Sequence, residues 1–332
     1  MEGGSQKLFL GIDAGSTKTL ALLADQSGNV LGEGRAPTCN LAVCDHETAV
    51  GNLSAALTSA AQAAGLRQGV EIDSVFIGAA GISSPEEEAA VCQLIESTDV
   101  FRFRKIRAGN DILLVLAGGL GGKPGIVLIS GTGSNCFGRR ADGQTASAGG
   151  LEWLIDDRGS GFKIGLEGIV GAVRAADGRG AATSLQNAIF DALGIEGLPQ
   201  IISRLHGRGG KGALIAKSEV AALAPLVIEK AGQGDQVAAT ILQTEVAELR
   251  VMLATVAKKL DMTDAPFHWT VAGSVGNCPA ILTMLRQDVA AELPSAVYLP
   301  QQLPPERGAI LLAAEIAGLS DLENLKNTLA NS

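Results

Sequence analysis

Three glycine turns with neighbouring hydroxyl groups follow apolar stretches of this 332-residue sequence. They are "DAGST" at 13–17, "GTGS" at 131–134 and "GSVGN" at 273–277. Glycine turns at strand ends expose backbone N–H groups, and Ser or Thr hydroxyls add donors, so each turn could hold the oxygens of a phosphate. A single turn of this kind is usually a tight hairpin, but three at the ends of apolar strands favour a polyphosphate gripped by two of them.

Two aspartates stand where they could assist phosphoryl transfer. Asp13 begins the first glycine turn and could hold Mg²⁺, directly or through water. Asp111 follows a strand and begins an apolar helix, where it could accept the proton of an attacking hydroxyl. A carboxylate at that position could equally cap the helix. The residues alone leave both roles open for Asp111.

Composition excludes several classes of protein. The net charge is −9, aromatic residues are 3%, and the basic cluster at 101–107 is short, so a nucleic-acid surface is not expected. No run of 18 apolar residues and no secretion signal occur, so no membrane span and a cytoplasmic location are expected. Five scattered cysteines and three distant histidines predict neither disulfides nor a zinc site. Neither a P-loop nor a dinucleotide fingerprint is present.

The pattern of elements repeats along the chain. In the first half we predict strands at 7–12, 19–25 and 30–36, a helix at 46–64, a strand at 71–81, a helix at 83–97, and a strand and helix around Asp111. From 125 the order restarts, with strands at 125–130, 136–141 and 145–150, a helical region at 160–260 with a glycine-rich loop at 206–212, a strand at 267–275, and helices at 278–293 and 305–319. Two mixed sheets of this kind would place both phosphate turns at the mouth of one cleft.

Three regions follow from this repeat. Residues 1–117 form an N-terminal lobe, 118–304 form a C-terminal lobe with a helical insertion, and 305–332 form a C-terminal helix that packs back on the first lobe. A hinge is expected near the glycine-rich stretch 117–125. Closure about it would exclude water from the reaction.

Four motifs carry a resemblance to a known family. "GIDAGSTKT", "ISGTGSNC", "GG" followed by "WLIDDRGSGFKIG", and "VAGSVGN" resemble, in order, those of N-acetylglucosamine kinases of the BadF/BadG type. The resemblance implies an α/β, two-lobed actin-like (ribonuclease H-like) ATPase fold, with lobes of βββαβαβα type. It also implies transfer of the γ-phosphoryl of MgATP to the 6-hydroxyl of N-acetyl-D-glucosamine, and a homodimer. D-glucosamine is the alternative substrate.

The resemblance also implies roles for individual residues. Asp111 is the catalytic base, and Asp13 holds Mg²⁺. The implied ATP contacts are Asp13, Gly15, Ser16, Thr17, Lys18, Gly131, Thr132, Gly133, Ser134, Gly273, Ser274 and Asn277. The implied sugar contacts are Asn40, Asn110, Asp111, Thr132, Gly150 and Asp157. Asp157 could instead be a solvated loop acid, or pair with its neighbour Arg158.

The chain departs from the family pattern beside Asp157. The run Asp156-Asp157-Arg158 carries a guanidinium where the family keeps a carboxylate, and Leu151 stands where a tryptophan is common. An unacetylated sugar, or an acidic one that reaches Arg158, is therefore conceivable. For Trp153, two places after Leu151, we expect core packing rather than sugar stacking.

Two further classes of function share the phosphate motifs. One is an ATPase that activates a dehydratase through a bridging iron–sulfur cluster, for which Cys136 and Cys278 follow the second and third turns. The absence of a cluster-like cysteine pair disfavours it. The other is a non-catalytic sugar sensor, which would need neither Asp13 nor Asp111.

Overall fold

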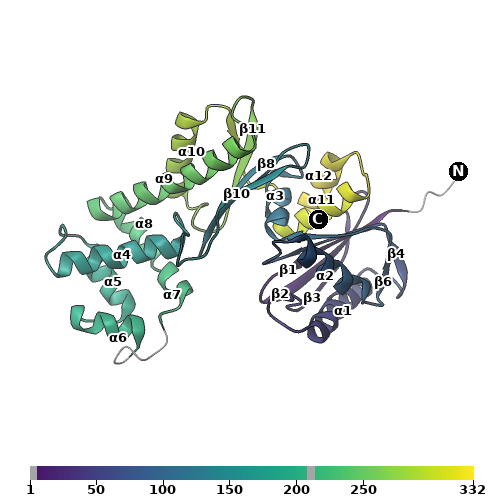
Figure 1. Cartoon of the computed structure of the whole chain (residues 1–332), viewed down its shortest axis with the longest axis horizontal. Coiled ribbons are helices and arrows are strands. Elements are labelled where there is room, and N and C mark those ends of the chain that lie inside the picture. Colours follow the sequence, from purple (N-terminus) through teal and green to yellow (C-terminus); the bar gives the residue numbers. More distant parts are fainter. Residues whose placement is uncertain (1–5, 208–213) are drawn as a thin grey trace. The chain divides into compact units, whose positions relative to one another are not determined.

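The computed structural model describes residues 6–207 and 214–332, so the predicted loop at 206–212 lies largely outside the described residues. The chain forms two compact units (Figure 1). One contains the residues up to Gly125 together with Leu299–Ser332, and the other is Ile126–Tyr298. The first unit thus extends to Gly125 rather than to 117, and the chain returns to it at Leu299 rather than at 305. The reason is that the carbonyls of Gly118 and Gly119 accept hydrogen bonds from the N–H groups of Leu303 and Gln302, which holds both segments in the first unit.

The first unit contains one five-stranded sheet, a small two-stranded sheet and five helices among the described residues. Its elements are β1 (Leu8–Ala14), β2 (Lys18–Asp25), β3 (Val30–Pro37), α1 (His46–Ala63), β4 (Val70–Ile72), β5 (Ser74–Ala79), α2 (Pro85–Glu96), β6 (Phe101–Phe103), β7 (Ile106–Asn110), α3 (Ile112–Leu120), α11 (Pro305–Ile316) and α12 (Leu322–Asn331). The large sheet has the order β3-β2-β1-β5-β7, antiparallel among the first three strands and parallel from β1 onward.

Both faces of this sheet are covered, because alternate residues of β1 point to opposite sides. Leu10 and Ile12 pack with α1 and α2, whereas Phe9 packs with α3 and α11. A Cβ on Gly11 would lie only 2.7 Å from the Cβ of Ala309, so only glycine lets α11 approach the strand this closely. The C-terminal helix α11 therefore packs on β1 and α3 (Figure 1).

The second unit repeats this strand order and adds a helical insertion. Its elements are β8 (Gly125–Ser130), which begins at the unit boundary, β9 (Ser134–Arg139), β10 (Thr145–Gly149), α4 (Gly161–Ala176), α5 (Leu185–Leu193), η1 (Leu198–Gln200), α6 (Ile201–His206), α7 (Lys217–Ala221), α8 (Ala224–Gly232), α9 (Gln236–Lys259), β11 (Phe267–Ala272), α10 (Pro279–Glu292) and β12 (Ala296–Tyr298). The sheet order is β10-β9-β8-β11-β12, with β8, β11 and β12 parallel. The two sheets thus share one topology, as the repeat predicts.

Three details of the predicted elements are wrong. The single strand expected at 71–81 is two strands, β4 and β5, and the short elements β12 and α12 were not predicted. The break falls at Asp73, whose N–H donates to the carbonyl of Leu8 while its carboxylate accepts the N–H of Leu8. Because Asp73 turns its backbone to β1, the chain changes sheets there.

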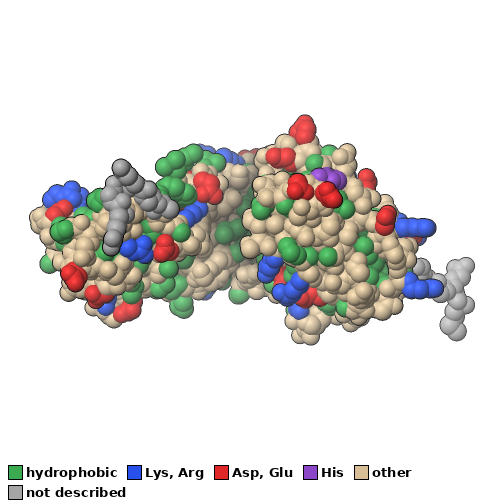
Figure 2. Space-filling view, turned by 90° about the horizontal axis from the view of Figure 1, so that it is seen from below, with side chains coloured by type: hydrophobic (Ala, Val, Ile, Leu, Met, Phe, Trp, Pro, Cys, Tyr) green, Lys and Arg blue, Asp and Glu red, His purple; other side chains and the backbone are tan. Residues whose placement is uncertain are grey.

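The exterior agrees with the composition. Figure 2 shows one face of the molecule, on which acidic and basic side chains are interspersed and no continuous basic stripe forms. Among the described residues, every helix is too short or too polar to cross a membrane.

Candidate active site

The first glycine turn joins β1 to β2 in the first unit. Asp13 is paired within the sheet, and Ser16, Thr17 and Lys18 are exposed at the turn. The hydroxyl of Thr38 donates a hydrogen bond to the carbonyl of Gly15 over 2.7 Å and so holds the turn in place. The donors of this turn are therefore open to a ligand such as a phosphate.

Acidic side chains gather behind this turn. Burial raises the pKa of Asp13, the charges of Asp111 and Glu306 raise it further, and Lys18 lowers it. A divalent cation would relieve this repulsion, so Asp13 fits a Mg²⁺ ligand. No group of three or more His, Cys, Asp or Glu suited to a metal occurs in the described part of the chain. Mg²⁺ commonly takes most of its ligands from water and phosphate with one or two carboxylates, and Asp13 would be such a carboxylate.

Asp111 stands at the start of α3 but does not cap it with its side chain. The neighbouring Asn110 takes that role, because its Oδ1 accepts the N–H of Ile112 over 3.0 Å. The capping alternative for Asp111 is therefore wrong. Burial raises the pKa of the Asp111 carboxyl and outweighs the backbone N–H groups of Ile112 and Asp111, which lower it, and the net shift suits a proton acceptor.

Asn40 and Asn110 shape the same loop of the first unit. Asn40 is 3% exposed, and its amide donates to the carbonyl of Ala80 over 2.9 Å while its Oδ1 accepts the N–H of Ala42. Asn110 donates to the carbonyl of Ile82 over 2.9 Å. A pocket of about 180 Å³ is lined by Asn40 and the segment 79–82. Both amides thus support the wall of this pocket through backbone contacts.

The second and third glycine turns lie against each other in the second unit. The carbonyl of Ser130 accepts the N–H groups of Val275 and Gly276 over 3.1 and 2.9 Å. Gly273 has φ of 91°, and a Cβ there would lie 2.3 Å from the carbonyl oxygen of Ser130. The structure therefore brings together the predicted ATP contacts 131–134 and 273–277, and glycine is required at the junction.

The turn at 157–161 is tied to the second phosphate turn. The N–H of Ser134 donates to Asp157 Oδ1 over 3.2 Å, and the Ser130 hydroxyl donates to the carbonyl of Gly159 over 2.7 Å. The N–H of Gly161, the first residue of α4, donates to the carbonyl of Gly131 over 2.7 Å. The predicted sugar contact Asp157 and the predicted phosphate turn consequently form one connected structure.

Asp157 is a buried member of an ion pair. Its side chain is 4% exposed, and its Oδ2 lies 2.7 Å from the Nζ of Lys217, at the start of α7. Lys217 also pairs with Glu152 over 3.2 Å. Burial by itself lowers the pKa of Lys217, but the contacts with Asp157 and Glu152 outweigh it and leave the pKa raised. Asp157 is therefore neither a solvated loop acid nor paired with Arg158, and sequence reasoning missed Lys217.

Arg158 points to a different partner. Its Nη2 lies 3.0 Å from Oε1 of Glu245 and 3.8 Å from Oε1 of Glu248, both on α9. Because its charge is already matched there, the idea that Arg158 selects an acidic sugar loses its basis.

Trp153 and Gly150 lie close in sequence to Asp157, and the structure shows the surroundings of both. Trp153 is 38% exposed, with its ring 5.5 Å from that of Phe162, so the prediction of core packing is wrong. Gly150, a weaker sugar candidate, has φ of 74° and packs against the side chain of Asn135.

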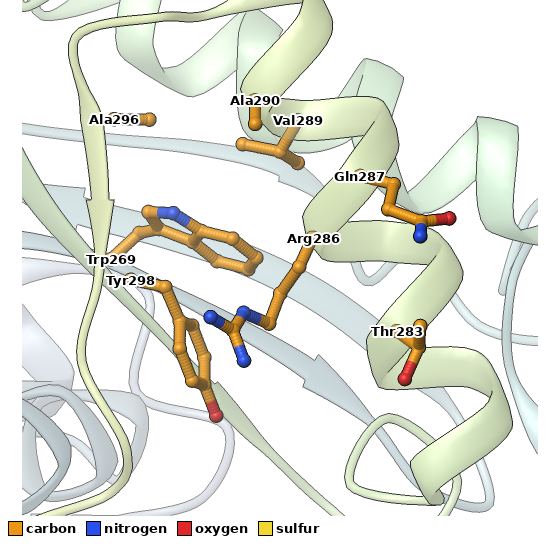
Figure 3. A pocket seen from close by; sticks show the side chains of 8 residues that line it. All are labelled: Trp269, Thr283, Arg286, Gln287, Val289, Ala290, Ala296 and Tyr298. Carbon is orange, nitrogen blue, oxygen red and sulfur yellow. The ribbon is translucent and has the colours of Figure 1, made fainter.

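A separate pocket of about 380 Å³ lies between α10 and strands β11 and β12. Figure 3 shows the Arg286 guanidinium beside the ring of Tyr298, 4.8 Å from its centroid, with Trp269 behind. None of the predicted site residues lines this pocket. It is therefore no part of the candidate site.

Comparison with known proteins gives consistent matches. The sequence model of the BadF/BadG/BcrA/BcrD ATPase family matches residues 10–313 of this chain. The N-acetylmuramic acid/N-acetylglucosamine kinase of Clostridium acetobutylicum is 31% identical over 73% of this chain and 78% of its own length. The N-acetyl-D-glucosamine kinase of Dictyostelium discoideum is 26% identical over 93% and 98%. A crystal structure of a proposed N-acetylglucosamine kinase from Chromobacterium violaceum has a TM-score of 0.64 at 24% identity, covering 92% of this chain and 98% of its own, which confirms the fold.

Proposed function

Since the chain belongs to the BadF/BadG/BcrA/BcrD ATPase family, we propose that it is an ATP-dependent amino-sugar kinase that phosphorylates the 6-hydroxyl of N-acetyl-D-glucosamine. The predicted enzyme class, a sugar kinase, is confirmed by relatives that carry this activity in their names. The particular sugar, the acceptor hydroxyl and the residues assigned to each step are parts of the proposal.

In the proposed reaction Asp111 accepts the proton of the sugar hydroxyl as that oxygen attacks the γ-phosphorus, and the bond from this phosphorus to the β–γ bridging oxygen breaks to release ADP. The turns at 15–17, 131–134 and 273–277 orient the nucleotide through N–H and hydroxyl donors. When bound, Mg²⁺ supplies charge neutralisation at the phosphates, and Asp13 is the residue that would hold it. Asp157 binds ring hydroxyls, and Asn40 and Asn110 line the sugar pocket, together with the weaker contacts Thr132 and Gly150.

The observation that carries this proposal is the state of Asp111. A carboxylate at the start of a helix would ordinarily cap it, yet Asn110 occupies the N–H of Ile112 and the carboxylate makes no cap. Its pKa is raised by burial. A half-buried acid that makes no cap, and whose N–H is bonded to the carbonyl of Ala79 in the pocket wall, suits the role of proton acceptor.

Two alternative functions receive less support. A dehydratase activator needs cysteines that reach a cluster between subunits, but Cys136 is 0% exposed within the second sheet. A sugar sensor would need neither Asp13 nor Asp111, the half-buried acids near the first turn. D-glucosamine remains the alternative substrate, but Arg158 gives no argument for it, because this guanidinium is matched by Glu245 rather than directed at a sugar.

The test is coupled detection of ADP release with N-acetylglucosamine, glucosamine, N-acetylmuramate and glucose, with Asp111→Asn as the inactive control. We expect N-acetylglucosamine to give the highest kcat/KM. Sugar-independent ATP hydrolysis alone, at equal rates in both proteins, would overturn the proposal.

A further inference from the structure

The turn that carries Asp157 has an unusual backbone. Asp157 has φ of 62° and Gly159 has φ of 77°, and both values lie in the left-handed region. For aspartate this conformation is sparsely populated, so the surrounding structure must hold it in place. A Cβ on Gly159 would lie 2.3 Å from Cγ of Leu249, which shows how closely α9 presses on the turn.

Glu245 of α9 contacts the turn with both carboxylate oxygens. Oε2 accepts the N–H of Gly159 over 2.7 Å, and Oε1 lies 3.0 Å from Nη2 of Arg158. Its side chain is 1% exposed. A carboxylate buried this deeply is tolerated only with such partners, because an unpaired buried charge is costly.

The other side of the same turn is bound to the phosphate turn. The Ser134 hydroxyl donates to the carbonyl of Arg158 over 2.7 Å, and the Ser130 hydroxyl donates to that of Gly159 over 2.7 Å. The residues between Asp157 and α4 are thus held from outside by Glu245 and from inside by the phosphate turn. A shift of this segment would displace Asp157 and residues 131–134 together.

From these contacts we propose that Arg158 and Glu245 form a positioning pair. The pair fixes the position of the phosphate turn at 131–134 relative to Asp157, the carboxylate proposed to bind the sugar. The assignment rests on the proposed function, since it supplies a role for two residues that the proposal assigns to neither substrate. It also accounts for the departure at 158, because the cation there is matched by a carboxylate on α9.

The experiment uses four variants of the full chain: Arg158→Met, Glu245→Gln, the double variant, and Glu248→Gln as the matched control. Glu248 lies on the same helix but is 42% exposed and 3.8 Å from Arg158. Arg158→Met leaves the buried carboxylate without its cation, and we expect KM for both sugar and MgATP to rise roughly 10-fold or more. The double variant, which removes both charges, should recover most of this loss, while Glu248→Gln should stay within about twofold of the parent.

A pH series separates positioning from a general loss of stability. The charged groups that act on Glu245 are Arg158, Lys163 and Glu167, and Glu248 lies near Arg158. In Arg158→Met the unpaired carboxylate becomes neutral as the pH falls, so the KM defect should shrink at acid pH. The double variant has no such group and should show no such recovery. Burial already raises the pKa of Glu245, which brings this change toward the accessible range.

Two outcomes would overturn the positioning pair. One is an unchanged KM for both substrates in Arg158→Met and Glu245→Gln while only the melting temperature falls. The other is a double variant no better than the worse single one. The dissociation constant for MgATP, measured by calorimetry on all variants, tests the pair even if no sugar is phosphorylated. Failure of the proposed function is then seen in the parent protein, whereas failure of the pair is seen in the differences between variants.

Discussion

The Nζ of Lys217 lies 2.7 Å from Oδ2 of Asp157, and the other carboxylate oxygen of Asp157 accepts the N–H of Ser134. Both oxygens of the acid assigned to sugar hydroxyls are therefore engaged by the protein itself. With 3% exposure, Asp157 depends on these partners for its orientation, because an unpaired buried carboxylate is costly. Lys217 belongs to the helical insertion, so this contact links the insertion to the residue proposed to bind the sugar.

Lys217→Met is expected to raise the sugar KM roughly 10-fold and to lower the free energy of unfolding by about 1–3 kcal/mol, because it leaves a buried carboxylate without its cation. Steady-state kinetics and denaturant unfolding measure the two effects. Lys230→Met, which removes a pairing lysine from α8, is the control and should leave the sugar KM unchanged. A lower sugar KM in Lys217→Met would instead mean that Lys217 competes with the sugar for Asp157.

Asp111→Asn should lower kcat by about 10²–10⁴, because the amide cannot accept the proton of the sugar hydroxyl. Binding of MgATP should remain close to that of the parent, since the residue is assigned to the acceptor rather than to the nucleotide. Single-turnover phosphorylation and calorimetric titration of MgATP test the two statements separately. Near-normal turnover would contradict the assignment of Asp111 as the base.

The pH dependence of kcat/KM should report on the same residue. Burial raises the pKa of Asp111 above its usual 3.8, and the base must be ionised to act. Activity should therefore fall as the pH drops through this raised pKa, about tenfold per pH unit. A pH profile measured with saturating MgATP checks this, and an activity that is constant down to pH 4 would contradict it.

The same shift has a consequence for stability, with the opposite sign. A raised pKa means that the folded state binds the proton more tightly than the unfolded state does, so Asp111 lowers stability as the pH rises through that pKa. Asp111→Asn should therefore be more stable than the parent at pH 7. The difference should vanish below the usual pKa of aspartate, near pH 4. Thermal unfolding at pH 4 and pH 7 measures it.

Local signals predicted much of this structure. The helix predicted at 83–97 has its start signal in the sequence, Ser84 and Pro85 followed by acids, and the structure has the complete capping box between Ser84 and Glu87. The glycine turns could also be predicted, because an apolar strand followed by Gly and Ser is a local signal that spans only a few residues. The split at Asp73 was missed because the apolar pattern continues through it, while the cause is a pairing with Leu8 far along the chain.

The partners of the site could not be read from sequence. Lys217 and Glu245 lie 60 and 87 residues from their partners Asp157 and Arg158, and each reads as an ordinary charge on a helix. Glu245 stands in a run of mixed polar and apolar residues and would be assigned to the solvated face, yet it is 1% exposed. The role of Glu245 becomes clear only from the packing of α9 on the turn at 157–161. The resemblance supplied roles for Asn40 and Asn110, but not the backbone contacts that hold them.

The junction of the second and third turns gives the last prediction. Gly273→Ala combines an unfavourable φ of 91° with a Cβ placed 2.3 Å from the Ser130 carbonyl oxygen. Gly234 has almost the same φ, 92°, but nothing within 4 Å of a Cβ, so Gly234→Ala isolates the cost of the backbone conformation. That cost is about 1 kcal/mol. Gly273→Ala should lose clearly more stability and should raise KM for MgATP, because the Ser130 carbonyl also anchors the N–H groups of Val275 and Gly276. Equal losses of stability in the two variants, with an unchanged KM for MgATP, would show that the contact at Ser130 does not constrain the nucleotide site.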